Sequence, residues 1–343
     1  MKAAVNSSKF GMASLKIFGL LFIYLGLIAC APTVMLPGKQ VANPELNEGN
    51  FITSDNHVLP VKSWLPKVGS VNHIIIALHG FNDYSNFFQD SALWLQQFGV
   101  ASFSYDQRGF GASANTGLWA GANTMAQDLT EFIGVIKKRY SNTPIYLLGE
   151  SMGGAVVMVT MTEKNSPDVN GIILAAPAVW GETTMPWYQR WALTIGSYTV
   201  PWMKVSGSGL KIKPSDNIPM LRKLGSDPLI IKETRIDAIH GLTHLMGLAL
   251  ERSNQLHHPA LILYGELDEI IPKLPTAMML QSLPESAKNK QKIALYENGY
   301  HMLLRDLNAE LAHKDILAWI NNPKKTLPSK ADIRPIQVLL EKD

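Results

Sequence analysis

Gly149-Glu150-Ser151-Met152-Gly153 directly follows the apolar run Ile145-Tyr146-Leu147-Leu148. A serine flanked by glycines between a strand and a helix is typical of a nucleophile elbow, in which a sharp turn presents the serine hydroxyl above the sheet. The glycines lack the Cβ atoms that would clash in so tight a turn. This stretch therefore predicts a strand at residues 144–148, a helix at 153–162 and an exposed hydroxyl on Ser151.

Strand patterns alternate with helical patterns on both sides of this stretch. The unbroken apolar run at residues 74–78 fits a strand that is buried on both faces of a sheet. Further strands are predicted at 51–53, 59–65, 100–105, 172–178, 260–264 and 292–296, and further helices at 87–98, 125–140, 276–283 and 308–320. Strands separated by helices favour an α/β fold with a mostly parallel central sheet and helices on both faces.

Residues 180–257 interrupt this alternation. They carry half of the eight tryptophans of the chain and several methionines. We expect a helical cap here, whose apolar side chains either form a small core of their own or offer an apolar binding face. The cap divides the α/β core into residues 50–179 and 258–321, and residues 322–343 are expected to be a surface tail to which we assign no function.

The first 29 residues are predicted to be a signal peptide, with scattered lysines followed by an apolar run of thirteen residues. Such a run is shorter than the roughly 20 residues that span a bilayer. The sequence Leu27-Ile28-Ala29-Cys30 resembles the lipobox of bacterial lipoproteins, and Cys30 is the only cysteine. The resemblance implies acylation of Cys30 and an envelope location, and Ala31 suits the outer membrane. The alternative is a chance cysteine after an ordinary signal peptide or anchor.

Residues 30–49 are rich in small residues, Pro, Gly and Asn, which fits an extended tether, with the folded domain starting near Asn50. The net charge of the chain is +3, but three lysines and no acidic residue precede Cys30. The rest of the chain therefore carries 28 basic and 28 acidic side chains, and the composition predicts no nucleic-acid partner.

An activated serine needs a histidine base and an acid that orients it, and α/β-hydrolases carry them in the order serine, acid, histidine. Asp268 and His301 each follow a predicted parallel strand, at the sheet edge where ligands bind. Glu266 and Glu269 remain alternative acids beside Asp268.

Seven other histidines are expected to be structural or solvated, in loops, on helix surfaces or within the cap; they are His57, His73, His240, His244, His257, His258 and His313. His240 and His244 have the i, i+4 spacing of metal ligands. Because no third ligand follows a recognisable spacing, we predict no metal site.

The tetrahedral intermediate of such a reaction needs two N–H donors for its oxyanion. The backbone N–H of Met152 comes directly after the nucleophile, where a helix begins. The second is expected from the loop after His79-Gly80, with the N–H of Phe81 as the candidate. His79 is expected to brace this turn rather than to transfer protons.

A family resemblance rests on five motifs: His79-Gly80-Phe81-Asn82-Asp83-Tyr84, Asp106-Gln107-Arg108-Gly109-Phe110-Gly111, Gly149-Glu150-Ser151-Met152-Gly153-Gly154, Asp268 before Pro272, and His301. Together they resemble the monoacylglycerol lipase and lysophospholipase branch of the serine α/β-hydrolases over residues 50–320. The resemblance implies Ser151 as nucleophile, Asp268 as acid, His301 as base, and Phe81 and Met152 as oxyanion donors.

Two residues depart from that family pattern. Glu150 stands where animal members carry a histidine, and Phe81 is bulkier than the usual alanine. Both departures bear on acyl-chain preference.

The sequence thus predicts a membrane-tethered serine esterase that cleaves monoacylglycerol- or lysophospholipid-like esters without a metal or organic cofactor. Within the enzymes, a peptidase or a cofactor-free haloperoxidase on the same scaffold is the alternative. A non-catalytic lipoprotein that binds lipid in the envelope is the alternative from another class. The sequence predicts no oligomeric state.

Overall fold

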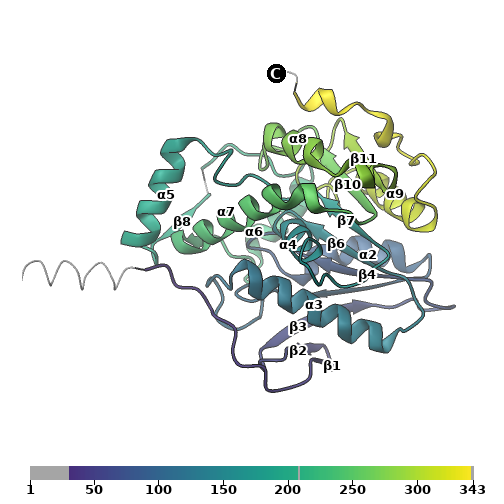
Figure 1. Ribbon diagram of the computed structural model, residues 1–343, viewed down its shortest axis with the longest axis horizontal. Helices are drawn as coiled ribbons and strands as arrows, with labels where there is room; N and C mark the ends of the chain where they lie inside the picture. The colour runs from purple at the N-terminus through teal and green to yellow at the C-terminus, as the bar shows by residue number, and fades with distance from the viewer. Residues whose placement is uncertain (1–30, 208, 341–343) are drawn as a thin grey trace, which may run out of the picture.

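The computed structural model describes residues 31–207 and 209–340, which form helices packed around one large sheet (Figure 1). The predicted signal peptide and Cys30 lie outside these residues. Within the described ranges, no helix is both long enough and apolar enough to cross a membrane.

Nine strands of the described chain form the central sheet, in the order β1-β2-β3-β5-β4-β6-β7-β10-β11. The parallel strands are β4 (His73–Leu78), β5 (Val100–Tyr105), β6 (Ile145–Glu150), β7 (Gly171–Ala175), β10 (Ala260–Gly265) and β11 (Gln291–Tyr296). The antiparallel strands are β1 (Glu45–Asn47), β2 (Asn50–Ile52) and β3 (Val58–Trp64). This mostly parallel sheet confirms the predicted α/β-hydrolase fold class.

Helices cover both faces of the sheet. On one face lie α3 (Ala122–Arg139), α4 (Met152–Met161) and α8 (Lys273–Ser282), and on the other α2 (Gln89–Gln96) and α9 (Ala309–Asn321). The side chains of β4 alternate between the two cores, with Ile74 and Ile76 in the first and Ile75 and Ala77 in the second. The strand is apolar throughout because both of its faces are buried. Short 3-10 helices complete the core at Ser85–Phe88, Arg252–Gln255, Glu285–Lys290, Ala331–Ile333 and Ile336–Leu339.

The cap, residues 180–257, leaves the sheet after β7 and returns at β10. It contains α5 (Trp187–Thr199), β8 (Lys204–Ser206), α6 (Ile218–Ser226), β9 (Glu233–Arg235) and α7 (Ile236–Glu251). The segment is mostly helical, as predicted, but β8 and β9 pair as a small antiparallel ribbon that the sequence pattern did not indicate. Leu245 and Met246 of α7 belong to the main core, so this helix joins the cap to the sheet.

The ordered domain begins earlier than the predicted Asn50. β1 pairs with β2, and Met35 N donates a hydrogen bond of 2.8 Å to the carbonyl of Trp119. Gly38 N also donates to Asp55 Oδ2 at 2.8 Å. The described part of the predicted extended tether, residues 31–49, is therefore held against the domain at several points. The contact of Met35 with Trp119 joins residues 84 apart in the sequence, so the composition of the segment gave no sign of it.

The carboxyl-terminal segment also differs from the expected surface tail. Residues 322–340 fold back onto the domain, with Leu327 and Ala331 buried in the core on the α9 face of the sheet and Leu339 in the core on the α8 face. The Lys292 ammonium group of β11 lies 2.7 Å from Asp332 Oδ2, and both side chains are largely buried. The segment is part of the domain.

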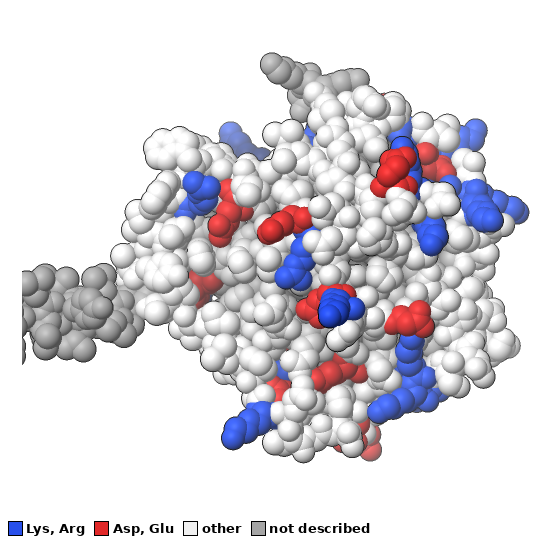
Figure 2. Space-filling model, viewed as in Figure 1, with Lys and Arg blue, Asp and Glu red and all other residues white. Residues whose placement is uncertain are grey.

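Charged side chains are scattered over the face seen in Figure 2, with blue and red groups interspersed.

Inside the protein, the Arg108 guanidinium binds Asp55 Oδ1 at 2.8 Å and Asp128 Oδ2 at 2.7 Å. The Asp-Gln-Arg-Gly motif is therefore a structural turn in this fold, since its arginine holds two other segments.

Gly153 offers a sharp test of packing between α4 and β4. A Cβ at this position would overlap the carbonyl oxygen and carbon of Leu78. We expect Gly153→Ala to lower the free energy of unfolding by about 3 kcal/mol, at the upper end of overpacking costs, in urea denaturation. Gly134→Ala in α3 is the matched control, because a Cβ there meets nothing within 4 Å. The free energy of unfolding of this control should rise by up to about 1 kcal/mol, because alanine has a higher helix propensity than glycine. Equal stability of the two variants would contradict the close packing.

Candidate active site

Ser151 occupies the turn between β6 and α4. Its φ of 53° and ψ of −116° are strained for a residue with a side chain. A Cβ on Gly149 would overlap the backbone of Gly153 and Gly154, so the turn closes only with glycine at this position. The geometry is that of the predicted nucleophile elbow, with Ser151 at the amino terminus of α4.

Asp268 and His301 meet at the carboxyl ends of β10 and β11. His301 Nδ1 lies 2.7 Å from Asp268 Oδ2, and both side chains are almost fully buried. Asp268 Oδ1 accepts hydrogen bonds from the N–H groups of Ile270 and Ile271, at 2.7 and 2.9 Å. These two backbone donors fix the carboxylate, so that one oxygen faces the imidazole.

The alternative acids have other partners. Glu266 accepts two hydrogen bonds from the Arg334 guanidinium, at 2.5 and 2.9 Å. Glu269 accepts from the backbone N–H of Lys213 at 2.7 Å. Of the three acidic residues in this turn, only Asp268 contacts His301 in the described structure.

Burial by itself lowers the pKa of His301. The negative charge of Asp268, its hydrogen bond to the ring and the carboxylate of Glu150 act in the opposite direction, and Arg305 partly offsets them. The net effect raises the pKa of His301 above its ordinary value. The imidazolium form is therefore stabilised, as a group that accepts a proton during a reaction requires.

The loop after β4 lies directly against Ser151. A Cβ on Gly80 would be 3.3 Å from the Ser151 Cβ, which places the neighbouring Phe81 beside the nucleophile elbow. His79 is fully buried; its Nδ1 contacts the carbonyl of Gly80 at 2.8 Å, and its Nε2 accepts from the N–H of Gln107 at 3.0 Å. Both ring nitrogens are occupied by backbone groups, so His79 braces this turn as predicted.

The remaining histidines lie elsewhere, and one differs from its predicted place. His313 is buried, not at a helix surface, and its Nε2 lies 2.8 Å from Ser91 Oγ. The described residues contain no group of three or more His, Cys, Asp and Glu side chains that could hold a metal ion.

A cavity of about 350 Å³ opens at Ser151 and His301. Its wall combines core residues with side chains from the cap, namely Trp180, Met185, Ile239, Leu242, Thr243 and Met246. Most of this wall is apolar, so the cavity suits a flexible hydrocarbon chain beside the serine. Ser151, His301, Phe81 and the cap thus meet at one place, although they are far apart in the sequence.

The cavity also contains a buried cluster of three charged residues that the sequence analysis missed. Arg305 Nη1 lies 2.8 Å from Asp83 Oδ2, and Arg305 Nη2 lies 2.8 Å from Glu150 Oε1. All three side chains line the cavity and are less than 9% exposed. Arg305 follows His301 by four residues, Glu150 precedes Ser151, and Asp83 belongs to the loop after β4. The sequence did contain one sign of this cluster, since Arg305 directly follows the apolar residues 302–304 after the candidate base His301.

A pH profile can test the influence of this cluster on His301. Protonated His301 cannot accept the serine proton, so kcat/KM should rise with pH through the His301 pKa. The Glu150 carboxylate raises that pKa. We expect Glu150→Gln to move the acid limb of the kcat/KM profile to lower pH. The midpoint of the limb does not depend on how much enzyme is folded.

Glu163→Gln is the control for this measurement, because it removes the same charge from an exposed site beyond the other end of α4. Its profile should match that of the unchanged protein. An acid limb that stays in place or moves to higher pH in Glu150→Gln would contradict the assignment.

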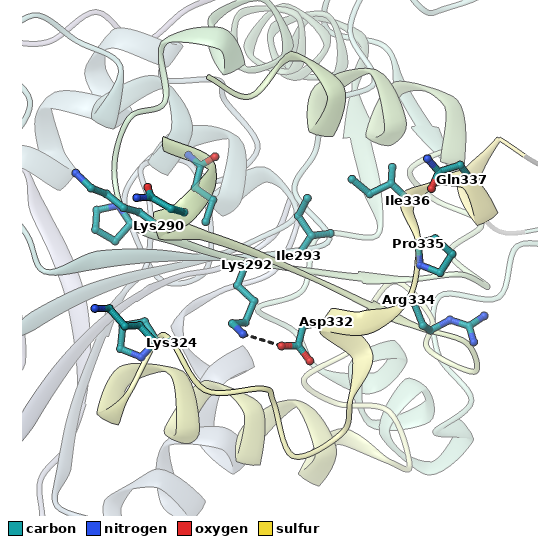
Figure 3. A pocket seen from close by; sticks show the side chains of 13 residues that line it. Lys290, Lys292, Ile293, Lys324, Asp332, Arg334, Pro335, Ile336 and Gln337 are labelled. Carbon is teal, nitrogen blue, oxygen red and sulfur yellow. Dashed lines mark hydrogen bonds and ion pairs between the residues drawn. The ribbon is translucent and has the colours of Figure 1, made fainter. Parts of the chain in front are cut away.

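A larger cavity, of about 770 Å³, lies between β11 and the carboxyl-terminal segment (Figure 3). Lys290, Lys292, Lys324 and Arg334 line it, and Lys292 is paired with Asp332. It contains none of the predicted site residues, and no serine or histidine lines it. The smaller cavity is the candidate active site because Ser151 and His301 both line it.

Comparisons with known proteins bear on the family and the fold of the chain. A family profile described as "Serine aminopeptidase, S33" matches residues 69–308. The human protein named monoglyceride lipase is 24% identical over 268 residues, covering 75% of this chain and 84% of its own. Caffeoylshikimate esterase from Arabidopsis thaliana is 26% identical over 297 residues, covering 83% and 88%.

Among solved structures, a soluble variant of monoglyceride lipase from Saccharomyces cerevisiae, in complex with a substrate analog, superposes with a TM-score of 0.66. It is 20% identical, and the match covers 85% of this chain and 99% of that one. This likeness shows the fold. Because the family profile covers more than half of the sequence, the chain belongs to this family of α/β-hydrolases, and it is a carboxylic ester hydrolase.

Proposed function

We propose that this enzyme hydrolyses esters of single fatty-acyl chains, of the monoacylglycerol or lysophospholipid kind, through an acyl-enzyme on Ser151. The observation that carries the proposal is the 2.7 Å contact of His301 Nδ1 with Asp268 Oδ2, where His301 lines an apolar cavity together with the strained Ser151. The printed names of several relatives, monoglyceride lipase among them, support the substrate class.

In the proposed mechanism, the N–H at His301 Nδ1 donates to Asp268, so the free nitrogen Nε2 is the base. Ser151 Oγ attacks the ester carbonyl carbon as Nε2 takes its proton, and the carbonyl oxygen becomes an oxyanion. The N–H groups of Phe81 and Met152 are the proposed donors to that oxyanion. His301 then passes the proton to the departing alcohol oxygen, which leaves an acyl group on Ser151.

Hydrolysis of the acyl-enzyme completes the cycle. Water now takes the role of the nucleophile, and Ser151 takes the role of the leaving group. His301 removes a proton from water, the hydroxide attacks the acyl carbon, and the proton returns to Ser151 as the fatty acid leaves. These steps need no metal or organic cofactor. Asp268 stays ionised throughout and stabilises the imidazolium in both halves of the reaction.

We also propose that Cys30 carries lipid and holds the enzyme in a bacterial envelope, with the outer membrane as its location. The lipobox-like sequence before Cys30 supports this. Metabolic labelling with a fatty-acid analogue should mark the mature protein and not Cys30→Ala. Equal labelling of the two proteins would overturn the proposal for Cys30.

A panel of p-nitrophenyl esters of increasing acyl length, followed by monoacylglycerols and lysophospholipids, tests the substrate class. We expect turnover that increases with acyl length. A fluorophosphonate probe should label the protein on the peptide that contains Ser151, as mass spectrometry would show. A short-chain optimum would overturn the lipase assignment, and labelling at another residue would overturn the mechanism.

A peptidase is the second candidate, because the matching family profile is described as a serine aminopeptidase. Aminoacyl p-nitroanilides belong in the same panel for this reason. Turnover of these amides above that of the long-chain esters would favour the peptidase.

A further inference from the structure

One segment of the cap contacts both the loop that carries the base and the loop that carries a proposed oxyanion donor. It comprises helix α6 and the stretches on either side of it, residues 213–234. We call it the α6 segment. In the described structure no side chain of α6 itself is buried. The stretches that flank the helix supply the hydrogen bonds that attach the segment to the α/β core.

The amino-terminal flank, residues 213–217, lies along the loop that follows His301. Three of its residues form hydrogen bonds with backbone groups of that loop, namely Pro214 with the N–H of Met302 at 3.0 Å, Asn217 with the carbonyl of Arg305 at 2.9 Å and Asp216 with the N–H of Leu307 at 2.8 Å. The loop of the base is therefore held by the cap at several successive positions.

Ser215 of the same flank reaches His301 through a carboxylate. Its hydroxyl donates to Asp306 Oδ1 at 2.6 Å, and Asp306 Oδ2 accepts from the backbone N–H of Tyr300 at 2.9 Å. Ser215 and Asp306 are both buried. Burial raises the pKa of Asp306 to about 6, whereas the hydrogen bonds from Ser215 and Tyr300 lower it. Both bonds thus favour the ionised carboxylate, which fixes the peptide group next to His301.

The carboxyl-terminal flank, residues 227–234, contacts the loop after β4. The N–H of Ile231 donates to the carbonyl of Asn82 at 3.0 Å, and Asn82 Nδ2 donates to Thr234 Oγ1 at 2.7 Å. Asn82 has a φ of 65°, a left-handed conformation that asparagine tolerates better than most residues. Because Asn82 directly follows Phe81, these two bonds fix the peptide group beside the proposed N–H donor.

We propose that the α6 segment is a brace that positions the catalytic base and an oxyanion donor relative to each other, with Ser215 and Thr234 as its positioning residues. Neither of them is among the described residues that line the active-site cavity. Ser215 acts through Asp306, and Thr234 acts through Asn82. The roles of the base and the donor rest on the proposed function.

Catalysis is sensitive to placement of this kind. An error of about 1 Å in the position of reacting groups can lower a rate by about a hundredfold, even when its cause lies far from the chemistry. The competing explanation is that the same hydrogen bonds only stabilise the cap. In that case their loss would lower the free energy of unfolding and leave kcat per folded molecule unchanged.

Steady-state hydrolysis of a soluble p-nitrophenyl ester by the full-length protein separates the two explanations. We expect Ser215→Ala and Thr234→Val each to lower kcat by about tenfold or more, because the reacting groups are misplaced. KM should change little, since neither side chain lines the cavity. Urea denaturation gives the fraction of each variant that is folded under the assay conditions, and kcat is corrected for it. Ser215→Thr keeps the hydroxyl and should recover most of the loss.

Two hydroxyl groups of α5 supply matched controls. Ser197 Oγ donates to the carbonyl of Thr194, and Thr199 Oγ1 to that of Ile195, both at 2.8 Å and both within the helix. Ser197→Ala and Thr199→Val therefore remove cap hydroxyls that do not reach the loops of the site. Both controls should keep the kcat of the unchanged protein.

Each end of the brace has its own readout. An alkyl trifluoromethyl ketone forms a hemiketal oxyanion on a serine nucleophile, so Thr234→Val should raise its inhibition constant by the factor by which kcat/KM falls. Proton NMR detects the hydrogen bond between His301 and Asp268. Ser215→Ala should shift this resonance, and Thr234→Val should leave it in place.

Failure of the brace and failure of the proposed function give different results. Turnover that increases with acyl length, with unchanged kcat in Ser215→Ala and Thr234→Val, would overturn the brace and sustain the proposed function. A short-chain optimum together with the expected losses in these variants would do the reverse. Losses of equal size in the two α5 controls would also overturn the brace.

Discussion

Ser151→Ala is expected to reduce kcat for a p-nitrophenyl ester by about 10⁶-fold, the loss typical of removing a serine nucleophile. The alanine variant keeps the apolar cavity and the backbone N–H groups of Phe81 and Met152, so any activity left comes from binding and from the oxyanion donors. The variant also removes the hydroxyl without adding atoms to the strained turn at φ 53°. Steady-state hydrolysis over a range of ester concentrations measures the effect.

Ser166→Ala controls for the loss of a hydroxyl at a half-buried position after α4. Its activity should equal that of the unchanged protein. If Ser151→Ala retained more than about one hundredth of the activity, the acyl-enzyme mechanism at this residue would be refuted.

Asp268→Asn is expected to lower kcat/KM by about 10⁴-fold, because it forces His301 into the wrong tautomer. The N–H groups of Ile270 and Ile271 both point at Oδ1, so the carbonyl oxygen of the new amide must take that place. The amide NH₂ then faces His301 Nδ1. That nitrogen must accept a hydrogen bond, which puts the proton on Nε2, where the serine proton should go.

Glu266→Gln and Glu269→Gln remove the neighbouring charges of the same turn, but their partners are Arg334 and the backbone of Lys213. Each should retain most of its kcat/KM. A larger loss in either variant than in Asp268→Asn would show that the acid had been assigned to the wrong carboxylate.

The local motifs were enough to predict the sheet and the elbow. Glycine at 149 is dictated by backbone contacts within one turn of chain, glycine at 153 by the Leu78 carbonyl of the adjacent strand β4, and the apolar run of β4 reports burial on both faces. The pairing of Asp268 with His301 followed from the known strand order of such folds together with the positions of the two residues. These features depend on short stretches of sequence or on a fixed topology.

The features that were missed depend on contacts between distant segments. Arg305 contacts Asp83 and Glu150, which are more than 150 residues away, and no periodicity marks such an ion cluster. The binding of Thr33 to Asp237 spans 204 residues. The composition of residues 30–49 indicated an extended tether, whereas the hydrogen bonds of Thr33 and Met35 go to partners that lie elsewhere in the fold.

The carboxyl-terminal segment has a consequence for the exposed edge of the sheet. β11 is the last strand of the sheet, and the outer side of such a strand exposes backbone groups that can pair with another molecule. At the opposite end, β1 is only three residues long, which leaves little to pair with. At β11, the folded-back residues 322–340, anchored by Lys292 and Asp332, shield the strand instead. We expect a chain that is truncated after residue 321 to expose the edge of the six-residue strand β11. That edge could pair with the same edge of a second molecule and lead to aggregation.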